Sequence, residues 1–391
     1  MVLPAEIESL QKAIRSESLD GWLFCNFRHR DKLSDQILHI PSGSSNSRFW
    51  FYAVPALGEP KKIIHSVEPD ALEALPGGKT CYVSREDLKN ALKPLAGLRW
   101  ALHFSEELPA ISYLDAGTAE LLKNIGLKLV SAGALIQRYS GLLDKEALAS
   151  HERSAVHLYE IVKSAWNLVK DSYRGGSPLY EGDIQKLILN EIKNCGLLTQ
   201  GEPIVAAGPN SGNPHYSFSG AGAKIKEGDI IQLDLWAREN QEGSVFADIS
   251  WAGVYGEKPD DEAVKKFNAL LSAREGAVSY IGEELAAGRR LTGEAVDRKA
   301  RGIIGSLGYG AGLKHRTGHG IDREIHGSGV NIDSIEFPDS RLLLEGSCFS
   351  LEPGIYFQDY GMRTEINVYI KDGKPYISGS PYERQETLMC C

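Results

Sequence analysis

Residues 315–326 read HRTGHGIDREIH and place three of the chain's ten histidines in one short segment. Gly318 and Gly320 flank His319, so the backbone on both sides can approach a ligand closely. His315 and His319 have the spacing of helical zinc ligands, but the glycines disfavour a helix and no Glu follows His315. The segment therefore predicts a loop that binds a ligand, and the helical zinc-protease motif fits it poorly.

This loop lies between two similar stretches of sequence, each with a pair of carboxylates. A Glu-Gly pair, at 227–228 and again at 345–346, precedes the first carboxylate by the same six positions from the glycine. A turn, at 242–243 and at 359–361, then separates the first carboxylate from the second. The carboxylates are Asp234 and Asp248 in one stretch and Glu352 and Glu365 in the other. Two such hairpins, related by a pseudo-two-fold axis, would bring four carboxylates together.

Strand periodicity places these acids opposite packed faces. The strand expected at 229–237 (DIIQLDLWA) has its apolar side chains on one face and Asp234 on the other, and the strand expected at 363–370 (RTEINVYI) places Glu365 in the same way. Such an acid is either exposed at a sheet edge or, if buried, must be paired, hydrogen-bonded or bound to metal. The histidines favour the metal, and a further one, His215, lies in a turn-rich loop.

Length and composition indicate a globular chain of two domains. The 391 residues are 42% hydrophobic and 24% charged. Residues 1–140 alternate helix and strand patterns without a glycine-rich phosphate loop or a cluster of metal-type ligands, which predicts an α/β domain with a role in support or specificity. Residues 141–391 run helices, strands, helices, strands, with long helical patterns at 145–170 and 261–282.

Charge and cysteine usage exclude several classes of protein. The net charge of −9 argues against a nucleic-acid partner, and no stretch approaches the roughly 20 apolar residues of a membrane helix. Without a signal-peptide pattern we expect a cytoplasmic location. None of the six cysteines forms a CxxC pair, so a redox motif or zinc knuckle is not expected. We expect Cys390 and Cys391 to form a frayed, exposed end, with a lipidation signal as the alternative.

The chain resembles the pita-bread metallopeptidases, which comprise methionine aminopeptidase, Xaa-Pro aminopeptidase, prolidase and the metal-free creatinase. The resemblance covers the whole chain, strongly over 200–370 and weakly in the N-terminal domain. It is carried by LDLWA with FADIS, HRTGHGIDREIH, SLEPGIY and MRTEINV. It implies a creatinase-type α/β domain at 1–140 and an α+β pita-bread catalytic domain at 141–391, with a pseudo-two-fold internal repeat.

The resemblance also implies roles for individual residues. The family's metal ligands carry over to Asp234, Asp248, His319, Glu352 and Glu365. Its substrate-binding and catalytic histidines carry over to His215 and His326, while His315 and Arg363 match the branch that cleaves Xaa-Pro bonds. Four carboxylates and an imidazole suit two divalent ions, with Mn²⁺ favoured and Co²⁺ or Zn²⁺ as alternatives. Glu352 would move the proton, and relatives are commonly homodimers.

Three departures from the family pattern bear on function. The two aspartates are farther apart than usual, an extension that we place at 237–243, and Ser250-Trp251 replaces the usual Thr-Arg. Gly327-Ser328-Gly329 follows the distal histidine, so we expect a small, open rim without a cation for a dipeptide carboxylate; Arg323 or Arg363 could supply one. The sequence therefore predicts an Xaa-Pro aminopeptidase. Alternatives are a prolidase, a hydrolase or lyase of non-peptide small molecules, and a non-catalytic binding protein.

Overall fold

The computed structural model describes residues 4–41, 43–379 and 384–391. The chain divides into two compact units, Met1–Ser140 and Gly141–Cys391, each with its own hydrophobic core. Within the described residues, no helix is long and apolar enough to cross a bilayer.

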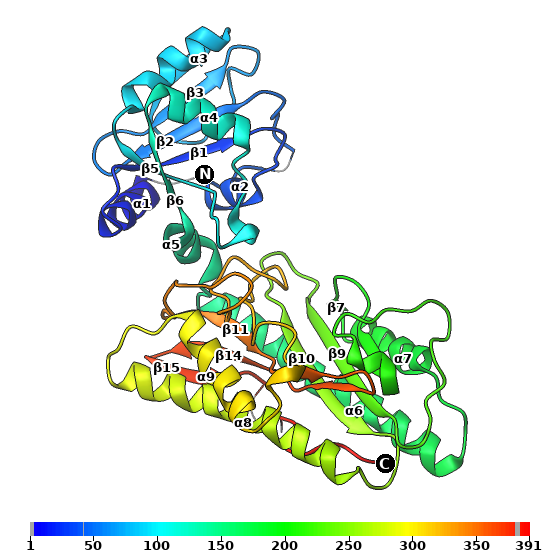
Figure 1. Cartoon of the computed structure of the whole chain (residues 1–391). Helices are drawn as coiled ribbons and strands as arrows, with labels where there is room; N and C mark the ends of the chain where they lie inside the picture. Colours follow the sequence, from blue (N-terminus) through cyan, green and yellow to red (C-terminus); the bar gives the residue numbers. More distant parts are fainter. Residues whose placement is uncertain (1–3, 42, 380–383) are drawn as a thin grey trace. The chain divides into compact units, whose positions relative to one another are not determined.

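The first unit is built on a six-stranded sheet with the strand order β4-β3-β2-β1-β5-β6 (Figure 1). Alternate residues of β1 enter different cores, since Trp22 and Phe24 pack on one face and Leu23 on the other. Helices therefore cover both faces, with α1 in the first core and α3 in the second. The strands are β1 (Gly21–Asn26), β2 (Trp50–Pro55), β3 (Lys61–His65), β4 (Gly78–Tyr82), β5 (Arg99–Leu102) and β6 (Lys128–Ser131). The helices are α1 (Pro4–Ser16), α2 (Lys32–Ile37), α3 (Arg85–Leu92), α4 (Ala116–Ile125) and α5 (Gly133–Ile136).

The second unit repeats a pattern of two helices followed by a hairpin. In the first half α6 (Lys145–Gly175) and α7 (Glu181–Asn194) precede β7 (Leu197–Leu198), β8 (Ile204–Ala207), β9 (Ile230–Glu239) and β10 (Ala247–Val254). In the second half α8 (Asp261–Ala286) and α9 (Gly293–Ser306) precede β11 (Cys348–Leu351), β12 (Gly354–Tyr356), β13 (Gly361–Arg363), β14 (Ile366–Lys371) and β15 (Lys374–Ile377). The helices expected at 145–170 and 261–282 are confirmed as α6 and α8.

Each half has its own core, which explains the strand periodicity. The apolar face of β9 packs with α6 and α7, and the apolar residues of β11 and β14 pack with α8 and α9. In β9 the three leucine and isoleucine side chains expected on one face are fully buried in the first core: Ile231, Leu233 and Leu235. Asp234 is thereby turned away from that core, as the alternation predicts.

The strand expected at 363–370 is wrong in one respect, because the chain changes partner there. β13 pairs with β12 and ends at Arg363, whereas β14 pairs with β11 and begins at Ile366. Between them the backbone N–H of Glu365 donates to Ser250 O at 3.0 Å, on β10. Glu365 therefore lies at a switch point between two pairings and faces the other hairpin.

The expectation of a frayed C-terminal end is also wrong. Met389 forms a parallel bridge with Gly253 of β10, and Cys391 N donates to Gly256 O at 2.9 Å. Gln385 accepts a hydrogen bond from Ala252 N at 2.9 Å. Residues 384–391 thus satisfy the backbone at the free edge of β10, and packing against both cores leaves the two terminal cysteines only partly exposed.

Candidate metal centre

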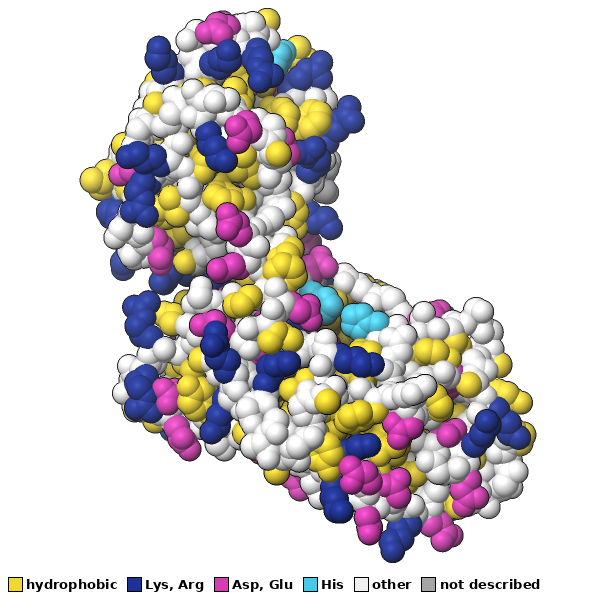
Figure 2. All heavy atoms as spheres, in the orientation of Figure 1, with side chains coloured by type: hydrophobic (Ala, Val, Ile, Leu, Met, Phe, Trp, Pro, Cys, Tyr) yellow, Lys and Arg dark blue, Asp and Glu magenta, His cyan; other side chains and the backbone are white. Residues whose placement is uncertain are grey.

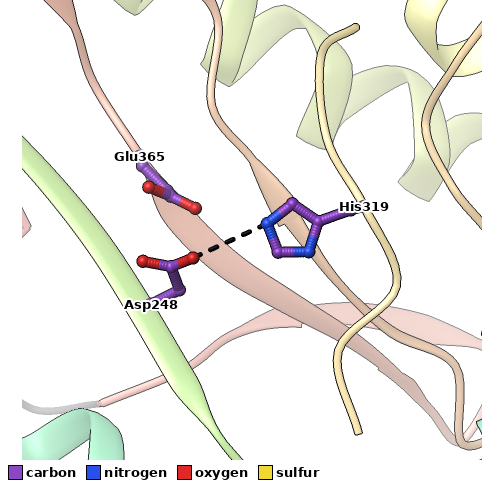
Figure 3. A group of neighbouring side chains, drawn as sticks. All are labelled: Asp248, His319 and Glu365. Atoms are coloured by element: carbon purple, nitrogen blue, oxygen red, sulfur yellow. Dashed lines mark ion pairs between the residues drawn. The ribbon is translucent and has the colours of Figure 1, made fainter. Parts of the chain in front are cut away.

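Three side chains from distant parts of the second unit converge on one point (Figure 3). Asp248 comes from β10, His319 from the glycine-flanked loop and Glu365 from the switch between β13 and β14, and all three are buried. One ligand atom of each lies within 4.8 Å of the other two, and His319 Nε2 is 3.6 Å from Asp248 Oδ2. This arrangement allows one cation to contact all three.

Two carboxylate oxygens in this group lack hydrogen-bond partners in the described structure. Asp248 Oδ1 and Glu365 Oε1 are both buried and unpaired. Burial raises the pKa of each carboxyl group well above its usual range, and neighbouring acids raise it further. Unpaired charge in the interior is unfavourable, and a bound cation removes that cost. The donor set therefore fits a metal ion.

The packing of the loop around His319 against β11 requires the glycine at position 318. A side chain at position 318 would place its Cβ 2.0 Å from Ser350 O, so only glycine allows the loop to approach β11. Ser350 Oγ accepts from His319 N at 3.0 Å, and the ring Nδ1 lies 3.3 Å from Gly320 O. Since a carbonyl only accepts, Nδ1 carries the proton and Nε2 keeps its lone pair for a metal. Burial lowers the pKa of His319, which favours the neutral ring.

Glu352 lies next to this group at the end of β11. Its Oε1 is 3.5 Å from His319 Nε2 and accepts a hydrogen bond from Ser350 Oγ at 3.2 Å. Its side chain is 14% exposed, against 8% for Asp248, so Glu352 has more access to solvent.

Asp234, the fifth expected ligand, has different neighbours. One oxygen accepts from Ser250 Oγ at 2.9 Å and the other is ion-paired with Arg363. The Ser250 hydroxyl also lies 2.9 Å from Glu365 Oε2 and accepts from Arg363 Nε at 3.0 Å. Ser250 therefore joins the two halves of the centre at the position where the family usually has threonine.

A chain of hydrogen bonds extends from Arg363 to His315. Arg363 NH1 donates to Tyr356 OH at 2.9 Å, and Tyr356 OH lies 2.8 Å from His315 Nε2. The other ring nitrogen of His315 lies 2.6 Å from Arg316 O, so Nδ1 donates there and Nε2 accepts from the tyrosine. Burial and the charge of Arg363 lower the pKa of His315 to about 3. The sequence does not predict Tyr356 as a site residue, because nothing local distinguishes it within SLEPGIY, and Ser250 is distinguished only as a departure from the family pattern.

The remaining two histidines are exposed. The ring of His326 packs edge-on against His319, with centroids 4.3 Å apart, and His215 lies in the loop that follows Gly208–Gly212. The neighbouring His319 and burial lower the pKa of His326 to about 3, with a smaller contribution from His215. Figure 2 shows histidine side chains on the accessible surface of the second unit, among acidic and basic groups.

The expectation of an open rim at Gly327 and Gly329 is wrong. Both glycines are buried, and a Cβ at position 327 would meet the Asp322 carboxylate at 2.5 Å. That carboxylate accepts from the Ser328 backbone N–H at 2.8 Å. Gly327 therefore makes room for an internal acid that braces the loop, whereas Gly329 lies against the backbone of Gly141.

Comparisons with known proteins agree with this geometry. Residues 149–372, more than half of the chain, match the model of metallopeptidase family M24. The chain is 33% identical over 184 residues to a putative Xaa-Pro aminopeptidase of Mycoplasma pneumoniae, covering 47% of this chain and 48% of that protein. It is 32% identical over 211 residues to an Xaa-Pro dipeptidase of Lactobacillus delbrueckii subsp. lactis, covering 52% and 53%. The chain thus spans about half the length of the curated relatives it matches.

Solved structures share the fold over the whole chain. Dipeptidase PepE from Mycobacterium ulcerans has a TM-score of 0.72 at 20% identity, covering 100% of this chain and 98% of that one. A prolidase from Thermococcus sibiricus has a TM-score of 0.66 at 23% identity, covering 100% of both. The architecture is therefore the pita-bread fold with an N-terminal α/β domain. The chain belongs to metallopeptidase family M24.

Proposed function

We propose that the chain is a dinuclear metal-dependent peptidase that hydrolyses the N-terminal peptide bond of peptides with proline in the second position. The observation that carries this proposal is the pair of orphaned oxygens, Asp248 Oδ1 and Glu365 Oε1, beside the neutral ring of His319. Together with Asp234 and Glu352 these residues form a hard, oxygen-rich donor set. Such a set suits Mn²⁺, with Co²⁺ or Zn²⁺ as alternatives. These five side chains would hold the ions.

The residues around the metal site have separate roles in proton transfer and substrate binding. Divalent ions supply a nucleophile by lowering the pKa of water and polarise the substrate carbonyl. Glu352 accepts and returns the proton, because its carboxylate adjoins His319 and keeps access to solvent. His326 and His215 donate hydrogen bonds to the carbonyl oxygen as its charge develops. The substrate amine is placed near Asp234, whose carboxylate Arg363 and Ser250 hold in position.

Substrate length separates an aminopeptidase from a dipeptidase. A dipeptidase must bind the free carboxylate of its substrate, and neither cation proposed for that role is suited to it. Arg363 is 3% exposed and bonded to Asp234, and Arg323 lines a small cavity beside Glu239. Because residues 327–331, directly after the distal histidine, contain no cation, we propose the aminopeptidase.

One observation favours a dipeptidase as the second candidate. Arg316 is half-buried directly after His315. Burial is the main cause of the lowered pKa of His315 and His319, and the neighbouring His319 is the main cause at His326; the charge of Arg316 adds a smaller contribution at all three. A guanidinium in this position can bind a carboxylate in a bidentate manner.

Steady-state kinetics with matched substrates test both candidates. The protein is stripped of metal, reloaded with Mn²⁺, and assayed for kcat/KM on Ala-Pro and Ala-Pro-Ala, with metal content measured by elemental analysis. The proposal expects a metal content near two ions per chain and a preference for Ala-Pro-Ala. A preference for Ala-Pro favours the dipeptidase, and cleavage of neither refutes the peptidase. The homodimer expected from the resemblance is tested on the same sample by light scattering.

A further inference from the structure

Glu181, the first residue of α7, is a fully buried carboxylate with four hydrogen-bond donors around it. Its Oε1 accepts from Ala207 N and from Asn210 Nδ2, both at 2.9 Å. Its Oε2 accepts from Ala223 N at 2.7 Å and from Tyr216 OH at 3.1 Å. A buried carboxylate is tolerated only with such compensation, and here each oxygen has two donors.

The four donors belong to one segment, residues 207–223, which carries His215. Ala207 and Ala223 are its two ends, so one carboxylate closes the loop. The backbone adds two further bonds, from Glu181 N to Ala223 O at 3.1 Å and from Gly182 N to Ala221 O at 2.9 Å. The loop is therefore fixed on the N-terminus of α7.

The same segment lies against the elements of the candidate metal centre. Ser211 Oγ accepts from Gly361 N at 3.1 Å, on the strand that ends at Arg363. Lys314 Nζ, next to His315, donates to Gly212 O at 2.8 Å. His215 itself is exposed, and its backbone N–H donates to Asn213 Oδ1 at 3.2 Å. The orientation of the His215 side chain therefore depends on the contacts that fix the 207–223 loop.

We propose that Glu181 is a positioning residue, which holds the 207–223 loop so that His215 lies beside the metal centre and meets the substrate. The inference rests on the proposed function, because it assigns His215 to the substrate. Tyr216 is the nearest link, since it follows His215 directly and donates to the Glu181 carboxylate.

The test is a double-mutant cycle between Glu181→Gln and His215→Ala. Glutamine keeps the shape but replaces one accepting oxygen by an amide that faces two donors. We expect Glu181→Gln to lower kcat/KM by about a hundredfold, the effect of a misplaced group near the chemistry. In the His215→Ala background the same change should cost little, because the group that it positions is gone. Additive losses would overturn the proposal and assign Glu181 a general structural role.

Glu68→Gln is the matched control. Glu68 is also buried and also accepts four hydrogen bonds, from Ser45 Oγ, Ser47 N, Ser47 Oγ and Arg48 N, but it lies in the first unit. It should leave kcat/KM on the peptide substrate unchanged. Metal content should be normal in both variants; loss of metal in Glu181→Gln would contradict positioning through His215.

Hydrogen exchange gives a readout that does not depend on activity. In Glu181→Gln, amides of residues 208–222 should exchange faster while those of α7 and β9 stay protected. Faster exchange throughout α7, or unchanged exchange in the loop, would overturn the proposal. If the protein proves to have no peptidase activity, the proposed function fails and exchange still decides whether Glu181 holds the loop. If Glu181→Gln does not fold, Tyr216→Phe, which removes one of the four bonds, enters the same cycle.

Discussion

The substitution Asp248→Asn tests whether the metal centre is under electrostatic strain without its ions. Asp248 Oδ1 has no hydrogen-bond partner, and Glu365 Oε1 nearby is also unpaired. The backbone of Asp248 is held independently, since Asn367 donates to its carbonyl at 2.7 Å and accepts from its N–H at 2.8 Å. Removing only the charge should therefore leave β10 in place. We expect the metal-free variant to be more stable than the metal-free wild type.

The magnitude follows from two terms. An unsatisfied buried polar group costs about 1–3 kcal/mol, and asparagine should recover part of that in the metal-free protein. An ion that binds only the folded state adds about 2.7 kcal/mol at one hundred times its Kd. At about 2–4 °C per kcal/mol for a unit of this size, the wild type should gain roughly 5–10 °C in Tm on metal addition. The variant should gain much less.

The pH dependence has a defined sign. Burial, with Asp234 and Glu352, raises the pKa of Asp248 above its unfolded value. The folded metal-free protein therefore binds more protons than the unfolded chain, and its stability falls as pH rises from about 4 through the folded pKa. Asp248→Asn should remove that part of the slope.

Differential scanning calorimetry with chelator and with Mn²⁺ measures both effects. Asp339→Asn is the control, because Asp339 is also buried but its carboxylate is ion-paired with Arg341 at 2.6 Å. That change should destabilise the protein with and without metal. The reasoning is refuted if Asp248→Asn lowers metal-free stability as much as Asp339→Asn does, or if its Tm still rises fully with Mn²⁺.

Four further predictions concern single side chains. Glu352→Gln should lower kcat by at least about a hundredfold, as loss of the proton carrier does, and steady-state kinetics will contradict this role if kcat is near normal. The His326→Ala variant should keep its metal, and the activation free energy of its turnover should rise by roughly 3 kcal/mol. The His319→Ala variant should lose metal. Elemental analysis of the two variants would show if their roles are exchanged. If dipeptides are the substrate, Arg316→Gln should lower kcat/KM on Ala-Pro by about tenfold or more and leave kcat/KM on Ala-Pro-Ala unchanged. The reason is that a charge-assisted hydrogen bond to the substrate carboxylate contributes about 1.5–3 kcal/mol. An equal loss on both substrates argues against such a contact. Burial opposes ionisation of Glu68, but hydrogen bonds from Ser47 and Ser45 lower its pKa to about 2. The ionised carboxylate therefore stabilises the fold fully above about pH 4.5, and this contribution to the free energy of unfolding is lost as pH falls towards 2. Urea unfolding at pH 6 and pH 3 should therefore show Glu68→Gln closer to the wild type at the lower pH.

The strands that build the second unit could be predicted because their burial is local and periodic. Alternation at Ile231, Leu233 and Leu235 reflects packing on α6 and α7, which the sequence expresses within one strand. The convergence of the carboxylates could be predicted from the sequence for a related reason. Two stretches with matched offsets produce matched hairpins, and an acid opposite an apolar face has few favourable environments.

What could not be predicted depends on pairing between distant segments. The switch at Glu365 arises because β13 and β14 pair with different strands, and no feature of RTEINVYI encodes that. The C-terminal residues pair with β10 across more than a hundred positions, and their place at the end of the sequence gives no sign of that pairing. Glu181 shows the same limit, because its donors lie 26 to 42 residues away.

Substrate choice is the hardest property to predict, because it depends on which side chains surround the site in space and not on their order in the chain. Gly327 was interpreted as part of an open rim because glycine lacks a side chain, yet the volume that it leaves is filled by Asp322. The family pattern predicts a cation for a substrate carboxylate just beyond the distal histidine, and residues 327–331 contain none. Arg316 precedes the proposed metal ligand His319, and its charge is one of the smaller causes, after burial and neighbouring groups, of the lowered pKa of His319 and His326. A glycine in the sequence indicates that another group packs closely against the backbone at that position, and only the folded chain shows which group it is.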